Sequence, residues 1–208
     1  MEPAGAKKQG RPRVAEREVL RSQALQVVLE LGYEHATMST IAERVGVALR
    51  TLHRYFPTKA DIVWGGLERS IDALRGGLTR ADDQRPVIEA VSAVIIEVFD
   101  DDGDELDVSR ARLRLIATVP ELQAIQTETF LLWQEQLSTY IARRVQTDPS
   151  GLVPIVAAKT LQAAVLHALQ WWAVHDVNVN PSEVVTTALG GLLDILGSTE
   201  PKPPAASA

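Results

Sequence analysis

The sequence predicts an all-α protein, with an N-terminal three-helix unit followed by a larger helical region and about nine helices in all. Apolar residues recur at helical spacing in each segment that lies between turn signals. No segment alternates apolar and polar residues for long enough to indicate a strand. A chain of 208 residues can also bury a sizeable core, and its length allows a small domain joined to a medium one.

The N-terminal quarter is expected to hold a basic arm and three helices. Residues 1–13 are rich in Gly, Pro, Lys and Arg, which is typical of a disordered arm. An apolar stripe that begins after Val14 predicts a first helix, which Gly32 ends. Thr37 is the expected N-cap of a short second helix that ends at Gly46, and a third helix is predicted over about residues 49–55.

The remaining chain is predicted to be helical as well. Thr58 and Asp61 have the spacing of a capping box, which predicts a long fourth helix running toward Leu78 and weakened by its glycines. Further helices are expected near residues 87–99, 109–118, 121–146, 152–174 and 182–196, separated by acidic, Pro-containing or Gly-containing segments. Residues 199–208 are of low complexity and are expected to be disordered.

Charge is unevenly distributed along this acidic chain of net charge −6. Residues 1–60 carry 10 Lys and Arg against 6 Asp and Glu, a balance of +4, whereas residues 61–208 carry 11 against 21, a balance of −10. Because salt limits electrostatic attraction to about 10 Å, a basic first quarter favours a polyanionic partner, with chance unevenness as the alternative.

Several classes of protein are disfavoured. There is no cysteine, which excludes disulfides and thiolate metal sites and fits a reducing compartment. No uninterrupted apolar run reaches the roughly 18 residues of a membrane span, and no hydrophobic stretch follows the basic N-terminus, so we expect a cytoplasmic protein without a membrane partner. No nucleophile elbow, phosphate-binding Gly loop or HExxH motif is present. We therefore expect no catalytic residues, cofactor or metal.

The second and third helices have the spacing of a helix-turn-helix. Small Ala42 allows two helices to approach, Gly46 makes the turn, and Val47 and Leu52 fix the crossing angle. In such a unit the second helix enters the major groove of DNA. Two short helices around a glycine also occur in other helical domains, so this spacing alone leaves DNA binding open.

The longer segment TMSTIAERVGVALRTLHRYFPTKADIV, residues 37–63, resembles the DNA-binding segment of the TetR family of transcriptional repressors. The positions that match the family pattern are Thr37, Ile41, Ala42, Gly46, Val47, Thr51, Leu52, Tyr55, Phe56, Thr58 and Lys59. There are three departures: His53 replaces the common Tyr, Ala48 replaces a small hydroxyl residue, and Leu49 stands where a polar residue is frequent.

This resemblance implies a set of DNA-binding residues. Arg50 and Thr51 would face the bases, Thr37 and Lys59 would hold phosphates, and Tyr55 would contact the backbone, although Tyr55 could equally pack on the first helix. Arg11 and Arg13 could enter the minor groove, or could simply be part of a solubilising tail. The full expected set is Arg11, Arg13, Thr37, Ser39, Arg50, Thr51, His53, Arg54, Tyr55 and Lys59.

For the C-terminal helices the resemblance implies effector binding and homodimerisation. The last two long helices have wide apolar surfaces that would pair across a two-fold axis, with Gly190 and Gly191 allowing close approach. Effector-binding candidates are the aromatic and polar residues Arg112, Phe130, Trp133, His167, Gln170 and Trp171; any of the rings could instead be core or dimer contacts. Adjacent Trp171 and Trp172 cannot share one face of a helix, so at most one of them can point into a cavity.

A second, weaker resemblance covers the central segment RARLRLIATVPELQAIQTETFLLWQEQL, which is similar to the mycofactocin-system regulators. It implies that acyl-coenzyme A-like or other hydrophobic compounds are candidate effectors, with Arg112 and Arg114 available for phosphates or simply solvated.

The expected domains are the arm at 1–13, the DNA-binding domain at 14–60, the effector-binding and dimerisation domain at 61–198 and the tail at 199–208. We expect a cytoplasmic, dimeric, ligand-responsive repressor of a palindromic operator. The alternatives are an effector-independent DNA-binding protein, an activator or a helical interaction module.

Overall fold

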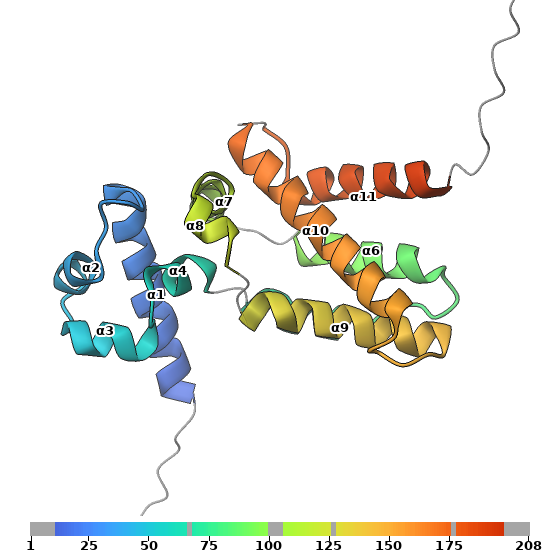
Figure 1. Cartoon of the computed structure of the whole chain (residues 1–208), viewed down its shortest axis with the longest axis horizontal. Helices are drawn as coiled ribbons and strands as arrows, with labels where there is room; N and C mark the ends of the chain where they lie inside the picture. The colour runs from blue at the N-terminus through green and yellow to red at the C-terminus, as the bar shows by residue number, and fades with distance from the viewer. Residues whose placement is uncertain (1–10, 66–67, 100–105, 126–127, 176–177, 198–208) are drawn as a thin grey trace, which may run out of the picture.

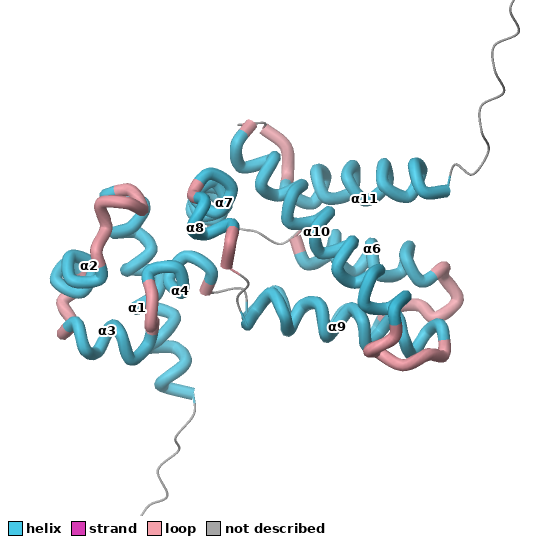
Figure 2. The backbone as a smooth tube through the Cα atoms, viewed as in Figure 1, coloured by secondary structure: helices cyan, strands magenta, loops and turns pink. Residues whose placement is uncertain are grey.

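A computed structural model of the chain describes residues 11–65, 68–99, 106–125, 128–175 and 178–197. These residues form helices joined by loops, and they contain no strand (Figure 2). The eleven helices are α1 Arg11–Leu31, α2 Met38–Arg44, α3 Leu49–Tyr55, α4 Lys59–Trp64, α5 Glu68–Arg80, α6 Val87–Val98, α7 Leu106–Thr118, α8 Pro120–Gln123, α9 Glu128–Val145, α10 Leu152–Val174 and α11 Pro181–Gly197. The predicted all-α class is therefore confirmed.

The three N-terminal helices form where the sequence predicts them, with one difference. Gly32 ends α1 at φ +79° and Gly46 makes the turn between α2 and α3 at φ +72°, a region that favours glycine. Thr37 caps α2, because its Oγ1 accepts a hydrogen bond from the backbone N–H of Thr40 at 3.1 Å. Helix α1 begins at Arg11 and not at Val14, so the end of the expected basic arm is helical.

The expected long fourth helix is wrong: the structure has two helices, α4 and α5, in its place. Thr58 and Asp61 form the predicted capping box, but α4 ends at Trp64 and the backbone of Gly65 is extended. A Cβ atom at Gly65 would lie 2.7 Å from the Asp61 carbonyl and 2.8 Å from the side chain of Arg21, so only glycine fits this position.

The helix expected over residues 121–146 is likewise divided, into α8 and α9. Pro120 begins the single turn of α8. The carbonyl of Leu122 accepts a hydrogen bond from the indole N–H of Trp64 at 3.1 Å, where a continuous helix would use it for its own ladder. These two divisions raise the number of helices from the expected nine or so to eleven.

The buried residues form two hydrophobic cores. The first core is made by α1 to α4 and also includes Ile116 of α7 and Leu122 of α8. The second core is made by α5, α6, α9, α10 and α11. Figure 1 shows α7 and α8 between the N-terminal helices and the rest of the molecule, so these two helices connect the two cores.

By length and composition alone, α10 could cross a membrane, although the sequence predicts no membrane span. Its surroundings give a different explanation, because α10 packs against α7, α9 and α11. Its apolar inner face, which includes Leu161, Val165, Leu169 and Trp172, is buried by these neighbours. We therefore interpret α10 as the central helix of the second core.

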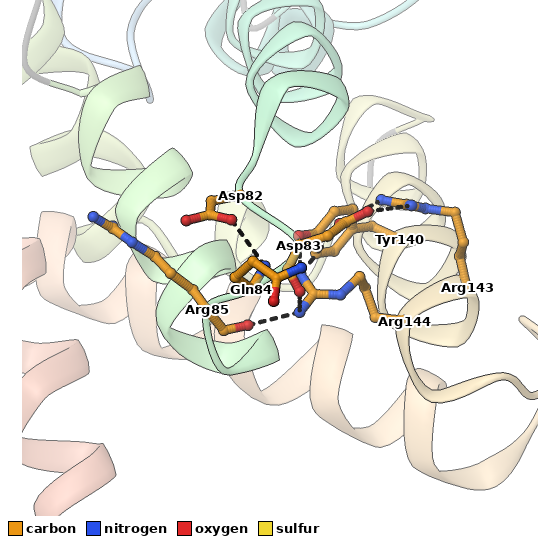
Figure 3. A network of polar contacts seen from close by, with 7 residues as sticks. All are labelled: Asp82, Asp83, Gln84, Arg85, Tyr140, Arg143 and Arg144. Carbon is orange, nitrogen blue, oxygen red and sulfur yellow. Dashed lines mark hydrogen bonds and ion pairs between the residues drawn. The ribbon is translucent and has the colours of Figure 1, made fainter.

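A network of polar contacts, called here the distal clamp, ties the α5–α6 loop to the end of α9 (Figure 3). Arg143 donates two hydrogen bonds to the carboxylate of Asp83, at 3.2 and 3.3 Å, which lower the pKa of Asp83 below its usual value. Arg144 donates to the carbonyls of Asp83 and Arg85, at 3.0 and 2.6 Å, and to the hydroxyl of Tyr140 at 2.6 Å. The clamp fixes the end of α5 that is farther from α4.

The packing of α5 on α6 generates a stability prediction. A Cβ atom at Gly77 would lie 2.5 Å from Cγ1 of Val94 on α6, and a β-branched side chain has little freedom to move aside. We expect Gly77→Ala to destabilise the fold by about 1–3 kcal/mol. Gly76→Ala is the matched control, since its Cβ would meet only the flexible end of Arg80. That change should stabilise the fold by about 0.5–1 kcal/mol through helix propensity.

Chemical denaturation of both variants checks this prediction. If Gly77→Ala were as stable as Gly76→Ala, the close approach of α5 and α6 would be contradicted.

Candidate nucleic-acid interface and effector region

The exposed face of α3 is basic. Leu52 is fully buried in the first core and fixes the rotation of the helix. Two residues along an α-helix correspond to a turn of about 200°, so Arg50 and Arg54, on either side of Leu52, point away from the core. Both are exposed, as is His53, while Thr51 is half-buried. The helix therefore presents three basic side chains to solvent from two turns.

Some of the predicted DNA-binding residues also make contacts within the chain. The guanidinium of Arg54 lies 5.1 Å from the ring centre of Tyr55, which itself packs against the first core. Nδ1 of His53 lies 3.1 Å from the carbonyl oxygen of Pro57. The hydroxyl of Thr37 serves as the α2 cap, and Ser39 is exposed in the first turn of α2.

Lys59, which is expected to hold a DNA phosphate, contacts Tyr33 in this structure. Its ammonium donates a hydrogen bond to the backbone carbonyl of Tyr33 and lies 3.9 Å from the centre of the Tyr33 ring. The side chain is half-buried, so in this conformation the charge lies against the turn between α1 and α2. Arg11 and Arg13 belong to the first turn of α1, and their side chains lie outside the described part of the structure.

Among the described residues, three side-chain hydrogen bonds that link the N-terminal helices to α7 and α8 are together called here the joint. The hydroxyl of Tyr33 donates to Oε1 of Glu121 at 2.9 Å. The indole of Trp64 donates to the carbonyl of Leu122, and Arg112 donates to the carbonyl of Gly65 at 3.2 Å. Tyr33 is 4% exposed, and its burial, together with the nearby Glu121 carboxylate, raises its pKa above the usual value.

Of the residues that form the joint, only Arg112 is among the candidates predicted from the sequence. Tyr33 and Glu121 are 88 positions apart, and nothing in the local spacing of either residue indicates that they pair. Trp64 ends a short helix whose end was itself unexpected. The only available signal was the presence of large aromatic residues next to glycines, at Gly32–Tyr33 and Trp64–Gly65.

The six effector candidates separate into two groups. Phe130 and Trp133 belong to α9, and Arg112 belongs to α7, where it bonds the carbonyl of Gly65. Nε1 of Trp133 donates to Oγ of Ser70 at 3.2 Å, and its ring lies 6.1 Å from that of Phe99. Two polar residues that were not among the predicted candidates, Ser70 and Gln162, bond the indole of Trp133 and the carbonyl of Phe130. Gln162 is buried and donates from Nε2 to the Phe130 carbonyl at 2.8 Å, while its Oε1 has no hydrogen-bond partner among the described residues.

The other three candidates lie toward the outer face of α10. Trp171 is 47% exposed and stacks on His175, with ring centres 4.5 Å apart. His167 is exposed, and its Nδ1 lies 2.9 Å from Oε1 of Gln170, which is half-buried. Of the adjacent tryptophans only Trp172 is buried, which agrees with the expectation that the two cannot share one face of the helix. Its indole N–H donates to the carbonyl of Val179 at 2.8 Å.

A small cavity of about 160 Å³ lies elsewhere, between α5, α6 and their connecting loop. Its lining includes Arg80, Asp82, Arg85 and Glu97 and none of the effector candidates. Because its charged residues are exposed at the surface, it is a poor match to a largely apolar ligand.

Comparisons with known proteins agree with this architecture. Residues 20–63 match the family described as bacterial regulatory proteins, tetR family, and residues 85–197 match the MftR C-terminal domain. A Mycobacterium tuberculosis protein assigned to the transcriptional regulation of mycofactocin biosynthesis, MftR, is 29% identical over 175 residues, which cover 84% of this chain and 86% of MftR.

Two solved structures show the same fold at low sequence identity. Thermus thermophilus FadR, a TetR family transcriptional repressor in complex with lauroyl-CoA, is 17% identical with a TM-score of 0.59, and the match covers 92% of this chain and all of that one. SmeT, the repressor of the Stenotrophomonas maltophilia multidrug efflux pump SmeDEF, is 22% identical with a TM-score of 0.57, over 86% of this chain and 89% of that one.

Three findings agree: the helix-turn-helix has a basic α3, the C-terminal region is helical, and family models match more than half of the residues. The chain belongs to the TetR family of transcriptional regulators, with a C-terminal domain of the MftR type, and it is not an enzyme.

Proposed function

We propose that the protein is a repressor that binds a palindromic operator as a homodimer and is released from it by a small, largely apolar effector. The observation that carries the proposal is the exposed basic face of α3, held outward by the buried side chain of Leu52. A helix of this kind fits the major groove, where Arg50 pairs with guanine and Thr51 contacts a base edge. His53, Arg54 and Tyr55 contact the phosphates that flank these bases.

The first test is a selection of random duplex DNA on the purified protein, read out by sequencing. We expect a palindrome whose half-sites are about one helical turn apart, because the two recognition helices of a symmetric dimer reach successive major grooves. Absence of any enriched sequence at moderate salt would reject a specific operator and favour an effector-independent, non-specific DNA-binding protein.

Two substitutions separate base reading from phosphate binding. Arg50→Ala should cost about 1–3 kcal/mol of operator affinity and relax specificity at one base pair in each half-site. Lys59→Ala should weaken all sequences similarly and reduce the salt dependence of binding, since the ammonium that now lies on Tyr33 would turn to a phosphate. Binding titrations against specific and random duplexes at several salt concentrations distinguish the two effects. Equal losses on both duplexes for both variants would contradict this division of roles.

A second copy of the chain is the partner that best fits the outer faces of α10 and α11. Beyond its first turn and Lys159, the exposed residues of α10 recur at helical spacing: Val156, Thr160, Ala163, His167, Trp171 and Val174. On α11, Gly190 and Gly191 are exposed, and a Cβ atom at either position would meet nothing within 4 Å. Each glycine costs a helix about 1 kcal/mol, and packing within one chain does not require it. Close approach of a helix from a second copy would explain both.

A charge on this face should therefore prevent dimerisation. We expect Trp171→Glu to raise the dimer dissociation constant roughly hundredfold or more, because an unpaired carboxylate would be buried at the interface. Leu131→Glu is the matched control, since Leu131 on α9 is 51% exposed against 47% for Trp171. Sedimentation velocity over a range of concentrations measures both variants. A Trp171→Glu protein as dimeric as the control would place the interface elsewhere.

For the effector we propose the region around Trp133 and Phe130 on α9, where half-buried Ser70 bonds the indole of Trp133 and buried Gln162 bonds the carbonyl of Phe130, with Arg112 of α7 as the candidate cation. The candidates on the outer side of α10, exposed His167 and Trp171 and half-buried Gln170, belong instead to the proposed dimer face. FadR binds lauroyl-CoA and SmeT has been solved with triclosan, so related folds accept apolar ligands with and without phosphates. A long-chain acyl-coenzyme A and an uncharged aromatic compound are therefore the two probe classes that an effector screen should include first.

A further inference from the structure

The helix-turn-helix unit does not continue as a helix into the C-terminal region. Helix α4 ends at Trp64 and the backbone of Gly65 is extended. The apolar residues of α5 on the far side of this break, such as Ile71 and Leu74, belong to the second core. The orientation of α1 to α4 relative to the rest of the chain therefore depends largely on non-covalent contacts with α7 and α8. These include the buried side chains of Ile116 and Leu122, partly buried apolar residues such as Leu115 and Val119, and the three hydrogen bonds of the joint.

The three hydrogen bonds are not equivalent in position. The bonds of Trp64 and Gly65 are made by adjacent residues at the end of α4, so by themselves they leave the N-terminal helices free to rotate about that point. The bond of Tyr33 to Glu121 is made from another element, the turn between α1 and α2. Because this bond lies away from the end of α4, it restrains the rotation that the bonds of Trp64 and Gly65 allow.

We propose that the Tyr33–Glu121 hydrogen bond determines which spacing between operator half-sites the protein accepts. This inference rests on the proposed function, because spacing has meaning only for a dimer that reads two half-sites. If the C-terminal helices hold the two copies together, rotation of each N-terminal unit about the end of α4 changes the distance between the two α3 helices. Tyr33 stops that rotation, and it also supports the ammonium of Lys59 on its ring and carbonyl.

Conservative substitutions can test the bond without unfolding the protein. Tyr33→Phe removes only the hydroxyl and keeps the buried ring. Glu121 is exposed, so loss of its partner leaves its carboxylate in water. Glu121→Ala removes the acceptor from the other side, and Glu121→Gln keeps an acceptor oxygen for the phenol. Tyr140→Phe is the matched control, since Tyr140 is 5% exposed against 4% for Tyr33 and its hydroxyl bonds Arg144 in the distal clamp.

The experiment is a selection of full-length protein on duplexes that carry two copies of the selected half-site with every separation up to about one helical turn of 10 base pairs. Wild-type protein should discriminate against a separation wrong by a single base pair roughly tenfold, as strongly as against a mismatch. Tyr33→Phe and Glu121→Ala should accept such separations within about threefold while selecting the same half-site sequence. Glu121→Gln and Tyr140→Phe should retain the wild-type preference.

Other outcomes are equally informative. Unchanged spacing selectivity in Tyr33→Phe and Glu121→Ala, with wild-type melting temperatures, would overturn the inference and leave the proposed function intact. Loss of selectivity in Tyr140→Phe as well would assign the effect to general loosening of the fold and would also overturn it. If the wild-type protein enriched no palindrome at all, the proposed function itself would fail, and the inference with it. Should Tyr33→Phe not fold, the exposed Glu121 variants decide the question alone.

Discussion

The hydrogen bond from the indole of Trp64 to the carbonyl of Leu122 is the contact on which much of the architecture depends. Both residues are buried in the first core, where an unsatisfied indole N–H or carbonyl would be costly. The bond places the end of α4 against α8 and uses a carbonyl that would otherwise bond along a continuous helix. The short α8, the break before α9 and the attachment of the N-terminal unit to α7 and α8 are all compatible with this one contact.

Local sequence patterns predict helix ends correctly where the residues that set the end are close to it in the sequence. Thr37, Gly46 and the Thr58–Asp61 pair fixed three helix ends through their own backbone geometry and hydrogen bonds, and α3 has the bounds that the spacing predicted. The two divided helices could not be predicted in this way. At Gly65 a Cβ atom would collide with Arg21 as well as with the local carbonyl of Asp61, and the end of α8 is compatible with the bond from Trp64, so both breaks involve residues distant in sequence.

The same distinction applies to the site residues. The basic face of α3 follows from helical periodicity once Leu52 is assigned to the core, so it could be predicted. The effector candidates are predicted from residue type alone, and residue type does not say which side of a central helix a residue occupies. On α10, Trp172 lies on the apolar inner face and Trp171 on the moderately polar outer face. Only the packing of α7, α9 and α11 against α10 shows which of the two tryptophans is buried.

The position of α7 gives the chain a way to couple its two cores. Arg112 of α7 bonds Gly65 at the end of the N-terminal unit, and Ile116, one helical turn later, lies in the first core. The same helix packs along α10, the central helix of the second core. A ligand that displaced α7 from the interior would move Arg112 and Ile116 together, because a helix shifts as a rigid body. Helix α5 is less suited to transmit such a shift, since its near end is separated from α4 by Gly65 and its far end is held by the distal clamp.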